Sequence, residues 1–280
     1  MNRKILITGG NSGIGYEMAL AFAAQGDEVL IAARDAAKSA AAIARIRALH
    51  PQAQIESLSL DLGDWPGVDR CADAVLQRWP RIDVLILNAG LYTMKLSRLA
   101  NGYETMMGTM HFGHFRLAQR LLPAVQAAEQ GRIVVTSSMI HRLGRIDEAS
   151  FTNPGRHKSG LHAYGQAKLA NLLFTRELAR RLQGSRVTVN AFHPGAVATD
   201  IYRQVPAALR PLVTRFMLSP RQGADTAIWL ATAPELAGIS GEYFIKRQRK
   251  AGSALSRKPE EAARLWALSE QLFPASAPSP

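Results

Sequence analysis

The 280-residue sequence lacks most features that mark disulfide-linked, metal-binding or membrane-spanning chains. Its single cysteine, Cys71, excludes an internal disulfide and a cysteine-rich metal site, and is consistent with a reducing compartment. No apolar run reaches about 18 residues, so we expect no membrane-spanning helix. Because the first predicted strand begins almost at Met1, we also expect no signal or transit peptide and a cytoplasmic location.

Acidic residues are scarce relative to basic ones, and the difference gives a formal net charge of +12. Such an excess attracts anions, including a phosphorylated cofactor, a membrane surface or nucleic acid. The densest basic stretch is KRQRKAGSALSRK, from Lys246 to Lys258. Zinc-finger spacing, RNA-binding strand motifs and interleaved aromatic and basic residues are all absent. We therefore expect no nucleic-acid partner, favour a small anionic ligand, and leave peripheral membrane contact open.

The chain does contain an alternation of apolar strands and helices. Strands that are apolar throughout, with helices between them, predict a parallel sheet covered on both faces. We therefore expect an α/β fold, a single doubly wound Rossmann-type domain over residues 1–272, followed by a flexible tail at 273–280. The predicted strands are residues 5–8, 28–33, 54–60, 82–87, 132–138 and 186–192, and the predicted helices are residues 16–24, 36–49, 64–78, 102–128 and 161–184.

A glycine-rich turn follows the first strand. Gly9, Gly13 and Gly15 allow a tight turn and a close approach to a pyrophosphate, which the start of the next helix would bind through its N–H groups. The spacing is G-x-x-x-G-x-G instead of G-x-G-x-x-G, so a glycine loop without a ligand is the alternative. At the end of the second strand Arg34 suits a 2′-phosphate, which favours NADP over NAD. The next residue, Asp35, is instead a candidate helix N-cap.

Polar residues recur where the predicted strands end. The carboxyl ends of parallel strands form the ligand-binding edge of an open α/β sheet. Five positions beyond the glycine loop fall at such ends, which together indicate a site: Arg34, Asp61, Asn88, Ser138 and the turn Pro194-Gly195.

A tyrosine and a lysine share one face of the long helix that follows. Tyr164 and Lys168 are four residues apart, so both side chains can point into one site. A phenol has a pKa of about 10, and a nearby cation lowers it. The pair is thus a candidate acid/base device, with an incidental pair of surface neighbours as the alternative.

In this order the motifs resemble those of the short-chain dehydrogenase/reductase family, from about Lys4 to Phe273. The resemblance implies catalysis by Ser138, Tyr164 and Lys168, with Ser138 and Tyr164 touching the substrate. It also implies cofactor contacts, including the ribose by Tyr164 and Lys168. The remaining implied cofactor-binding residues are Gly9, Asn11, Ser12, Gly13, Ile14, Gly15, Arg34, Asp61, Leu62, Asn88, Ala89, Gly90, Pro194, Gly195 and Thr199.

The stretches SSMIHRLGRID and AYGQAKLANLLFTRELARRLQG resemble the retinol dehydrogenase-like branch more closely. This implies an NADP(H)-dependent oxidoreductase acting on a small alcohol or carbonyl substrate, expected to be apolar, with NAD the less favoured cofactor and homo-oligomers common in the family. One departure is Met110, which stands where many members carry a catalytic asparagine. A thioether cannot donate a hydrogen bond. The alternative is therefore an NADP-binding redox sensor or interaction protein with little turnover.

Two neighbouring histidines and two variable segments complete the expectations. We interpret His111 and His114 as packing or helix-surface residues and expect no metal site. Segments at about 140–162 and 200–220 would flank the nicotinamide. The second is either an apolar lid over the substrate or an ordinary helix packed on the domain.

Overall fold

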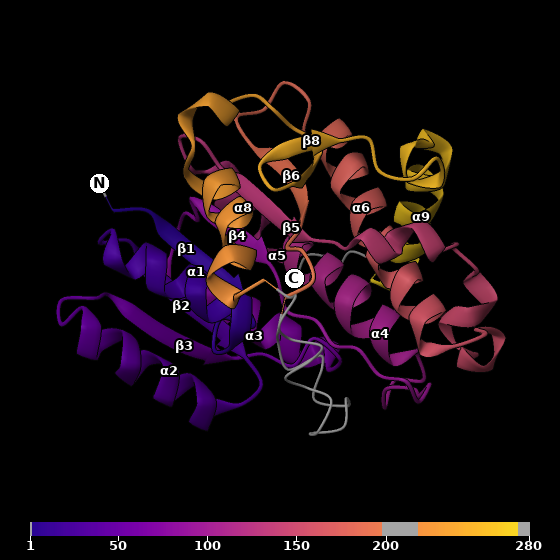
Figure 1. Cartoon of the computed structure of the whole chain (residues 1–280), viewed down its shortest axis with the longest axis horizontal. Coiled ribbons are helices and arrows are strands. Elements are labelled where there is room, and N and C mark those ends of the chain that lie inside the picture. The colour runs from indigo at the N-terminus through magenta and orange to yellow at the C-terminus, as the bar shows by residue number, and fades with distance from the viewer. Residues whose placement is uncertain (1, 198–217, 274–280) are drawn as a thin grey trace, which may run out of the picture.

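A computed structural model describes residues 2–197 and 218–273, which form a parallel sheet between two layers of helices (Figure 1). The strand order is β3-β2-β1-β4-β5-β6-β7-β8, and only β8 runs antiparallel to its neighbour. This arrangement confirms the predicted fold class. The strands are β1 Lys4–Thr8, β2 Glu28–Ala33, β3 Ile55–Ser59, β4 Val84–Leu87, β5 Arg132–Thr136, β6 Thr188–His193, β7 Tyr243–Ile245 and β8 Gln248–Lys250.

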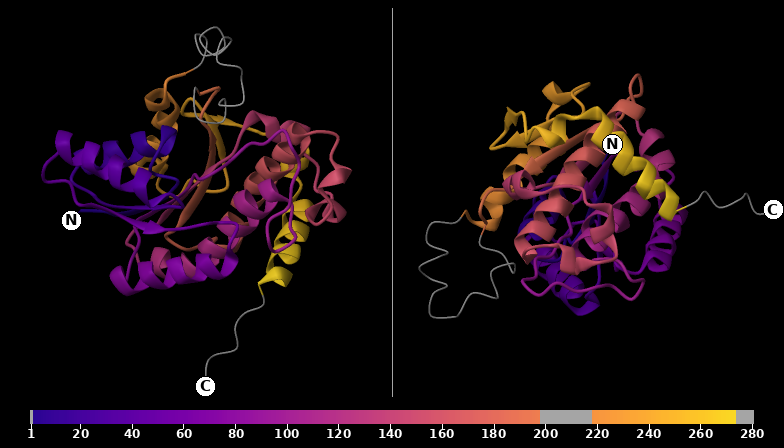
Figure 2. Two further views of the ribbon diagram at one scale, coloured as in Figure 1. Left: turned by 90° about the horizontal axis from the view of Figure 1, so that it is seen from below. Right: turned by 90° about the vertical axis from the view of Figure 1, so that its right-hand side faces the viewer.

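Separate cores fill the two faces of the sheet, which is why its central strands are apolar throughout. One layer contains α1 Gly13–Ala24, α2 Ala36–Leu49 and α8 Pro220–Thr232. The other contains α3 Trp65–Arg78, α5 Gly113–Gln126 and α6 Gly160–Arg181. Helix α9, Pro259–Leu272, packs outside α6 (Figure 2). Phe273 follows α9 and packs edge-on against Trp65.

The structure differs from the sequence-based expectation over residues 102–128, which do not form one helix. They contain α4 Thr105–Met107, a π-helical turn η1 Gly108–Phe112, and then α5. Glu104 begins the first of these by accepting hydrogen bonds from the amides of Met106 and Met107. Pro123 lies in the last turn of α5 and does not break it.

The hairpin of β7 and β8 was not predicted. Its turn places Lys246 and Arg247 in the left-handed region, at φ 51° and 58°, where asparagine or glycine is the usual signal. The basic stretch lies partly in this hairpin, and Arg247 and Arg249 pair with Asp225 and Glu242. Short 3-10 helices complete the described chain: η2 Met139–Leu143, η3 Glu148–Phe151, η4 Pro154–Arg156, η6 Pro234–Leu236 and η7 Leu255–Arg257.

No helix within residues 2–197 and 218–273 is long and apolar enough to span a bilayer. The strand order determines where a ligand can bind. Strands β1 and β4 are neighbours in the sheet, and the chain leaves β1 toward β2 on one side and β4 toward β5 on the other. Such a reversal opens a crevice at the carboxyl ends of the strands.

Candidate active site

The glycine-rich turn after β1 is shaped by close backbone contacts. Gly9 has a φ of 68°, and a Cβ atom on Gly15 would collide with the carbonyl oxygen of Gly9. Helix α1 starts at Gly13, its N-cap Ser12 makes no side-chain capping bond, and its first turn, which includes Ile14, holds no acidic residue. The positive end of α1 is therefore not neutralised by its own cap or first turn, and this cradle fits a pyrophosphate.

Arg34 directly follows β2 and is an exposed cation. No side chain among the described residues forms a hydrogen bond or ion pair with it. The following residue, Asp35, caps α2 by accepting a hydrogen bond from the amide of Lys38 at 2.9 Å, so the N-cap interpretation of Asp35 is confirmed. Asn11 donates to the carbonyl oxygen of Asp35 at 3.3 Å and to Ser39 at 3.1 Å, which holds the glycine turn beside Arg34.

The turns after β3 and β4 also lie at this edge. Asp61 is exposed and accepts a hydrogen bond from the amide of Gly63 at 2.8 Å, while Leu62 is buried. Asn88 donates from its amide side chain to the carbonyl oxygen of Thr8 at 3.1 Å. The backbone amides of Asn88 and Ala89 donate to the Thr8 hydroxyl at 2.9 and 3.0 Å. Thr8 thus fixes the start of the turn that ends at Gly90.

His114 connects that turn to the π-helical segment η1. Its Nδ1 lies 3.0 Å from the carbonyl oxygen of Met110, which can only accept, so Nδ1 carries the proton. Nε2 consequently accepts a hydrogen bond from the Thr8 hydroxyl, at 2.9 Å. Burial lowers the pKa of His114 to about 3, so the ring is neutral. Sequence reasoning missed this contact because no motif links Thr8 to His114.

Lys168 is a buried cation without a carboxylate partner among the described residues. Its ammonium donates to the carbonyl oxygen of Thr136 at 3.1 Å, and Asn171 donates to the same oxygen at 3.1 Å. Burial lowers the pKa of Lys168 to about 8. Two of its three donors thus have no acceptor within residues 2–197 and 218–273 and can serve a ligand.

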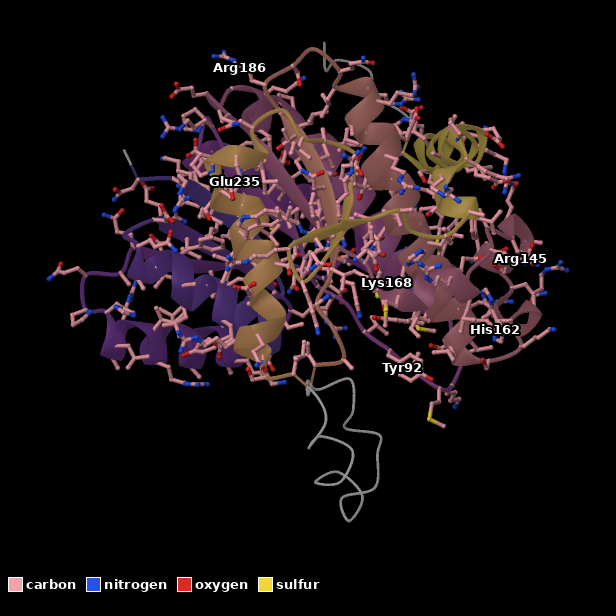
Figure 3. The ribbon with its side chains drawn as sticks, turned by 45° about the horizontal axis from the view of Figure 1, so that its top comes forward. Tyr92, Arg145, His162, Lys168, Arg186 and Glu235 are labelled. Atoms are coloured by element: carbon pink, nitrogen blue, oxygen red, sulfur yellow. The ribbon has the colours of Figure 1, made fainter. Side chains whose placement is uncertain are left out.

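Tyr164 and Ser138 lie on segments that pack directly against each other. The Tyr164 ring is 5.5 Å from the Lys168 ammonium and packs edge-on against Tyr92, with the ring centroids 5.7 Å apart. Ser138 is buried and begins η2, with its hydroxyl accepting from the amide of Ile140 at 3.2 Å. Figure 3 shows Lys168 and Tyr92 toward the same end of the molecule.

Two glycines allow this approach. A Cβ atom on Gly144, just after η2, would collide with the carbonyl oxygen of Gly165, the residue after Tyr164. In the other direction, a Cβ atom on Gly165 would lie 2.9 Å from the carbonyl oxygen of Ile140. The backbones of η2 and α6 are therefore in contact, which places the segment after Ser138 beside Tyr164.

Met110 is fully buried in η1 and lies close to Lys168. A Cβ atom on Gly90 would sit 3.2 Å from the Met110 sulfur and 3.5 Å from the Lys168 ammonium. The thioether gives packing here and no donor. The neighbouring His111 is buried, with Nε2 2.9 Å from the Ser269 hydroxyl, and its pKa is lowered to about 3 by burial. Within residues 2–197 and 218–273, no group of three or more His, Cys, Asp or Glu could hold a metal ion.

The turn after β6 completes the edge. Gly195 has a φ of 92°, and a Cβ atom there would collide with the Leu218 side chain. Pro194, the residue before it, is half-buried. Thr199 lies outside the described residues, as does the predicted pocket segment 200–220 up to residue 217.

The chain is similar in sequence to known proteins. The family model for short chain dehydrogenases matches residues 3–210. The chain belongs to the short-chain dehydrogenase family. It is 39% identical over 273 residues to retinol dehydrogenase 12 of Mus musculus, covering 97% of this chain and 86% of that protein. It is 36% identical to retinol dehydrogenase 13 of Homo sapiens, covering 99% of this chain and 86% of that protein. The predicted resemblance is therefore confirmed.

Solved structures of the family have the same fold. An uncharacterized protein from Mycobacterium paratuberculosis matches with a TM-score of 0.77 and 36% identity, covering 96% of this chain and 92% of that one. The Pseudomonas aeruginosa RhlG/NADP active-site complex matches with a TM-score of 0.69 and 27% identity, covering 86% and 93%. The chain is accordingly an oxidoreductase of the short-chain dehydrogenase family, whose fold binds a nicotinamide cofactor.

Proposed function

We propose that this protein is an NADP(H)-dependent oxidoreductase acting on an apolar alcohol or carbonyl substrate. The observation that carries the proposal is Lys168, a buried ammonium with no carboxylate among the described residues, 5.5 Å from the ring of Tyr164. A buried charge is costly unless paired, so its retention here favours a role with a ligand. The nicotinamide cofactor supplies the hydride chemistry when it is bound.

Tyr164 handles the substrate proton. In the reductive direction its phenol donates a proton to the substrate oxygen, and in the oxidative direction its phenolate removes one. The positive charge of the Lys168 ammonium stabilises the phenolate, and its remaining donors hold the nicotinamide ribose. Ser138 donates a hydrogen bond to the substrate oxygen and so stabilises the charge that develops there.

The choice of NADP rests on Arg34. Its guanidinium is exposed at the end of β2, and no acidic side chain in the described part of the chain pairs with it. The neighbouring Asp35 is engaged as the cap of α2 and as an ion-pair partner of Lys38, with 3.8 Å between the charged atoms. A cation without a partner suits a 2′-phosphate. The NADP complex of the related RhlG structure supports the same choice.

The substrate class rests on four exposed apolar side chains that lie on the segments next to Tyr164 and Ser138. Met139 and Leu143 come from η2, directly after Ser138, and Leu161 comes from the first turn of α6. Met94 lies against the start of α6, because a Cβ atom on Gly160 would be 3.1 Å from its Cα. Exposed apolar groups gathered at one approach favour an apolar ligand.

The alternative is an NADP-binding sensor or interaction protein with little turnover, and Met110 is the observation that favours it. A panel of apolar aldehydes and ketones with NADPH separates the two functions. We expect NADPH oxidation with the parent protein and a rate lower by about 10²–10⁴-fold in Tyr164→Phe, since general acid catalysis contributes on that scale. Tyr103→Phe is the matched control, because it removes a phenol hydroxyl from a ring that packs against Trp65 and that has no part in the proposed proton transfer. NADPH binding without Tyr164-dependent oxidation would favour the sensor.

A further inference from the structure

His141 is a buried histidine, and both of its ring nitrogens are engaged. Its Nδ1 lies 2.6 Å from the carbonyl oxygen of Ser138, and its Nε2 lies 3.0 Å from the amide nitrogen of Ser253. A carbonyl oxygen can only accept a hydrogen bond, so Nδ1 carries the proton and donates a hydrogen bond to the carbonyl oxygen of Ser138. Nε2 therefore accepts the N–H of Ser253. The side chain is fully buried, so water does not compete for either bond.

Ser253 belongs to residues 251–256, which we call the C-terminal loop. Arg176 holds this loop from the other side. Its guanidinium donates to the carbonyl oxygen of Ala251 at 2.7 Å, to the Ser256 hydroxyl at 3.1 Å, and to the carbonyl oxygen of Ser256. Arg176 lies on α6, eight positions after Lys168. The loop consequently joins the helix that carries Tyr164 and Lys168 to the segment that carries Ser138.

The C-terminal loop is tightly folded. Gly252 has a φ of 78°, and a Cβ atom there would lie 2.7 Å from the Ser256 hydroxyl oxygen. The amide of Ser256 donates to the Ser253 hydroxyl at 3.2 Å, and the Ser256 hydroxyl donates to the carbonyl oxygen of Ser253 at 2.8 Å. Ser256 is fully buried. A loop that is closed by its own hydrogen bonds is rigid, so it can fix the position of His141 relative to Arg176.

Packing alone does not account for His141. Its ring meets Tyr243 edge-on, with the ring centroids 5.3 Å apart, and phenylalanine could make the same contact. Phenylalanine would, however, leave the amide of Ser253 without its acceptor, and it would leave the carbonyl oxygen of Ser138 with only the backbone amide of residue 141, which donates to it at 3.1 Å. The paired hydrogen bonds, rather than the ring contact, distinguish histidine at this position.

We propose that His141 is a positioning residue that, through the C-terminal loop, fixes Ser138 relative to Tyr164 and Lys168. Its effect on turnover rests on the proposed function, whereas the connection itself does not. The connection passes through backbone atoms of Ser138 and Ser253. Loss of either ring bond separates the peptide after Ser138 from the C-terminal loop and leaves its carbonyl oxygen bonded to the backbone amide of residue 141 alone, without touching the cofactor-binding turns after β1 and β2.

The connection is tested first by the protonation of the ring. In the full-length, 15N-labelled protein with NADPH, the His141 signals, assigned by their loss in His141→Phe, should show the neutral ring with the proton on Nδ1. A proton on Nε2 of the neutral ring, or rapid exchange between the two neutral forms, would overturn the proposal. This measurement requires no substrate.

Turnover is tested with a matched pair at Ser253. Both Ser253→Ala and Ser253→Pro remove the hydroxyl, but only proline also removes the N–H that His141 accepts. We expect Ser253→Ala to stay within about threefold of the parent and Ser253→Pro to lose at least about tenfold in kcat, with the NADPH Kd unchanged in both. His141→Phe should behave like Ser253→Pro. Equal kcat in the two Ser253 variants, or a kcat near that of the parent in His141→Phe, would contradict the proposal.

Failure of this proposal is distinguishable from failure of the proposed function. A parent protein with no Tyr164-dependent NADPH oxidation would refute the proposed function, and the Nδ1–H signal of His141 would then decide the connection alone. An active parent whose His141 and Ser253 variants keep full kcat would instead preserve the proposed function and remove His141 from it.

Discussion

The basic side chains at the two edges of the sheet have different partners. At the amino ends of the strands, Arg3 pairs with Asp27 at 2.7 Å, Lys4 with Glu28 at 3.6 Å, and Arg81 with Asp83 at 3.2 Å. At the carboxyl ends, Arg34 and Lys168 have no carboxylate partner among the described residues. Charges that serve only the fold are expected to be neutralised, because an unpaired charge costs stability where water is excluded. Cations without an ion pair within residues 2–197 and 218–273 also occur at the amino ends, where Arg186 is exposed and the buried Arg132 donates to the carbonyl oxygen of Leu230. What marks the carboxyl edge as the ligand-binding one is therefore the buried ammonium of Lys168 together with Arg34 beside the glycine-rich turn.

The largest difference should appear in cofactor affinity. Arg34→Ala should weaken NADPH binding by roughly tenfold to a hundredfold and change NADH binding by less than about threefold, because only NADPH carries the 2′-phosphate. Isothermal titration with each cofactor measures this. Arg186→Ala is the matched control: Arg186 is also exposed and has no ion pair in the described part of the chain, but it precedes β6 at the opposite edge (Figure 3). Equal losses for NADPH and NADH in Arg34→Ala would refute the 2′-phosphate assignment.

Lys168 should cost the apoprotein stability at neutral pH. Burial lowers its pKa from 10.5 to about 8. Between these pH values Lys168 is protonated in the unfolded chain and neutral in the folded chain, so its contribution to the free energy of unfolding rises with pH. Below about pH 8 it is protonated in both states, and it lowers the free energy of unfolding by a constant amount. Lys168→Met should therefore stabilise the apoprotein by about 2 kcal/mol at pH 7, and the gain should shrink toward pH 10. Urea unfolding at several pH values measures it. A less stable Lys168→Met protein at pH 7 would show that the ammonium is satisfied in the fold.

Removing a charge at the amino edge should instead lower the stability of the protein. The buried Asp27 carboxylate accepts three hydrogen bonds from Arg3, one from its backbone amide and two from its guanidinium. Asp27→Asn should destabilise the protein by about 1 kcal/mol, because charged hydrogen bonds become neutral ones or are lost. NADPH affinity should not change. The same urea unfolding series measures the stability, and a loss of NADPH affinity would contradict the separation of the two edges.

Met110 should give the smallest effect. Its fully buried thioether packs near Lys168 and donates no hydrogen bond. Met110→Leu conserves volume and should keep kcat within about threefold, whereas a larger loss would mean that the sulfur itself takes part in proton exchange. Steady-state rates across pH 6–9 compare the two proteins.

The sequence predicted the fold class and the edge that carries the candidate site. Strand-end residues such as Asn88 and Ser138 could be predicted because a buried parallel strand is apolar throughout. The first polar residue after the apolar run therefore indicates where the strand ends. The π-helical turn at Gly108–Phe112 could not, since one extra residue in a helical turn leaves the apolar pattern almost unchanged. The β7–β8 hairpin escaped because Lys246 and Arg247 give no turn signal.

The internal supports of the site were also invisible in the sequence. Thr8 and His114 are 106 positions apart, and His141 and Ser253 are 112 apart. Each residue in isolation is ordinary for its element, such as a threonine ending a strand or a histidine in a helix. Only the fold brings the two members of each pair together. The spacing of motifs in the sequence therefore predicts the residues that would contact a ligand, but not the residues that position them.

Transfer of deuterium tests the central claim most directly. NADPH deuterated at the transferring C4 position should label the carbinol carbon of the alcohol product formed from an apolar aldehyde by the parent protein. Tyr164→Phe, shown by titration to bind NADPH as the parent does, should incorporate the label at least about 10²-fold more slowly. Absence of label with the parent across the aldehyde panel, or equal labelling with Tyr164→Phe, would contradict the assignment of this edge as a hydride-transfer site.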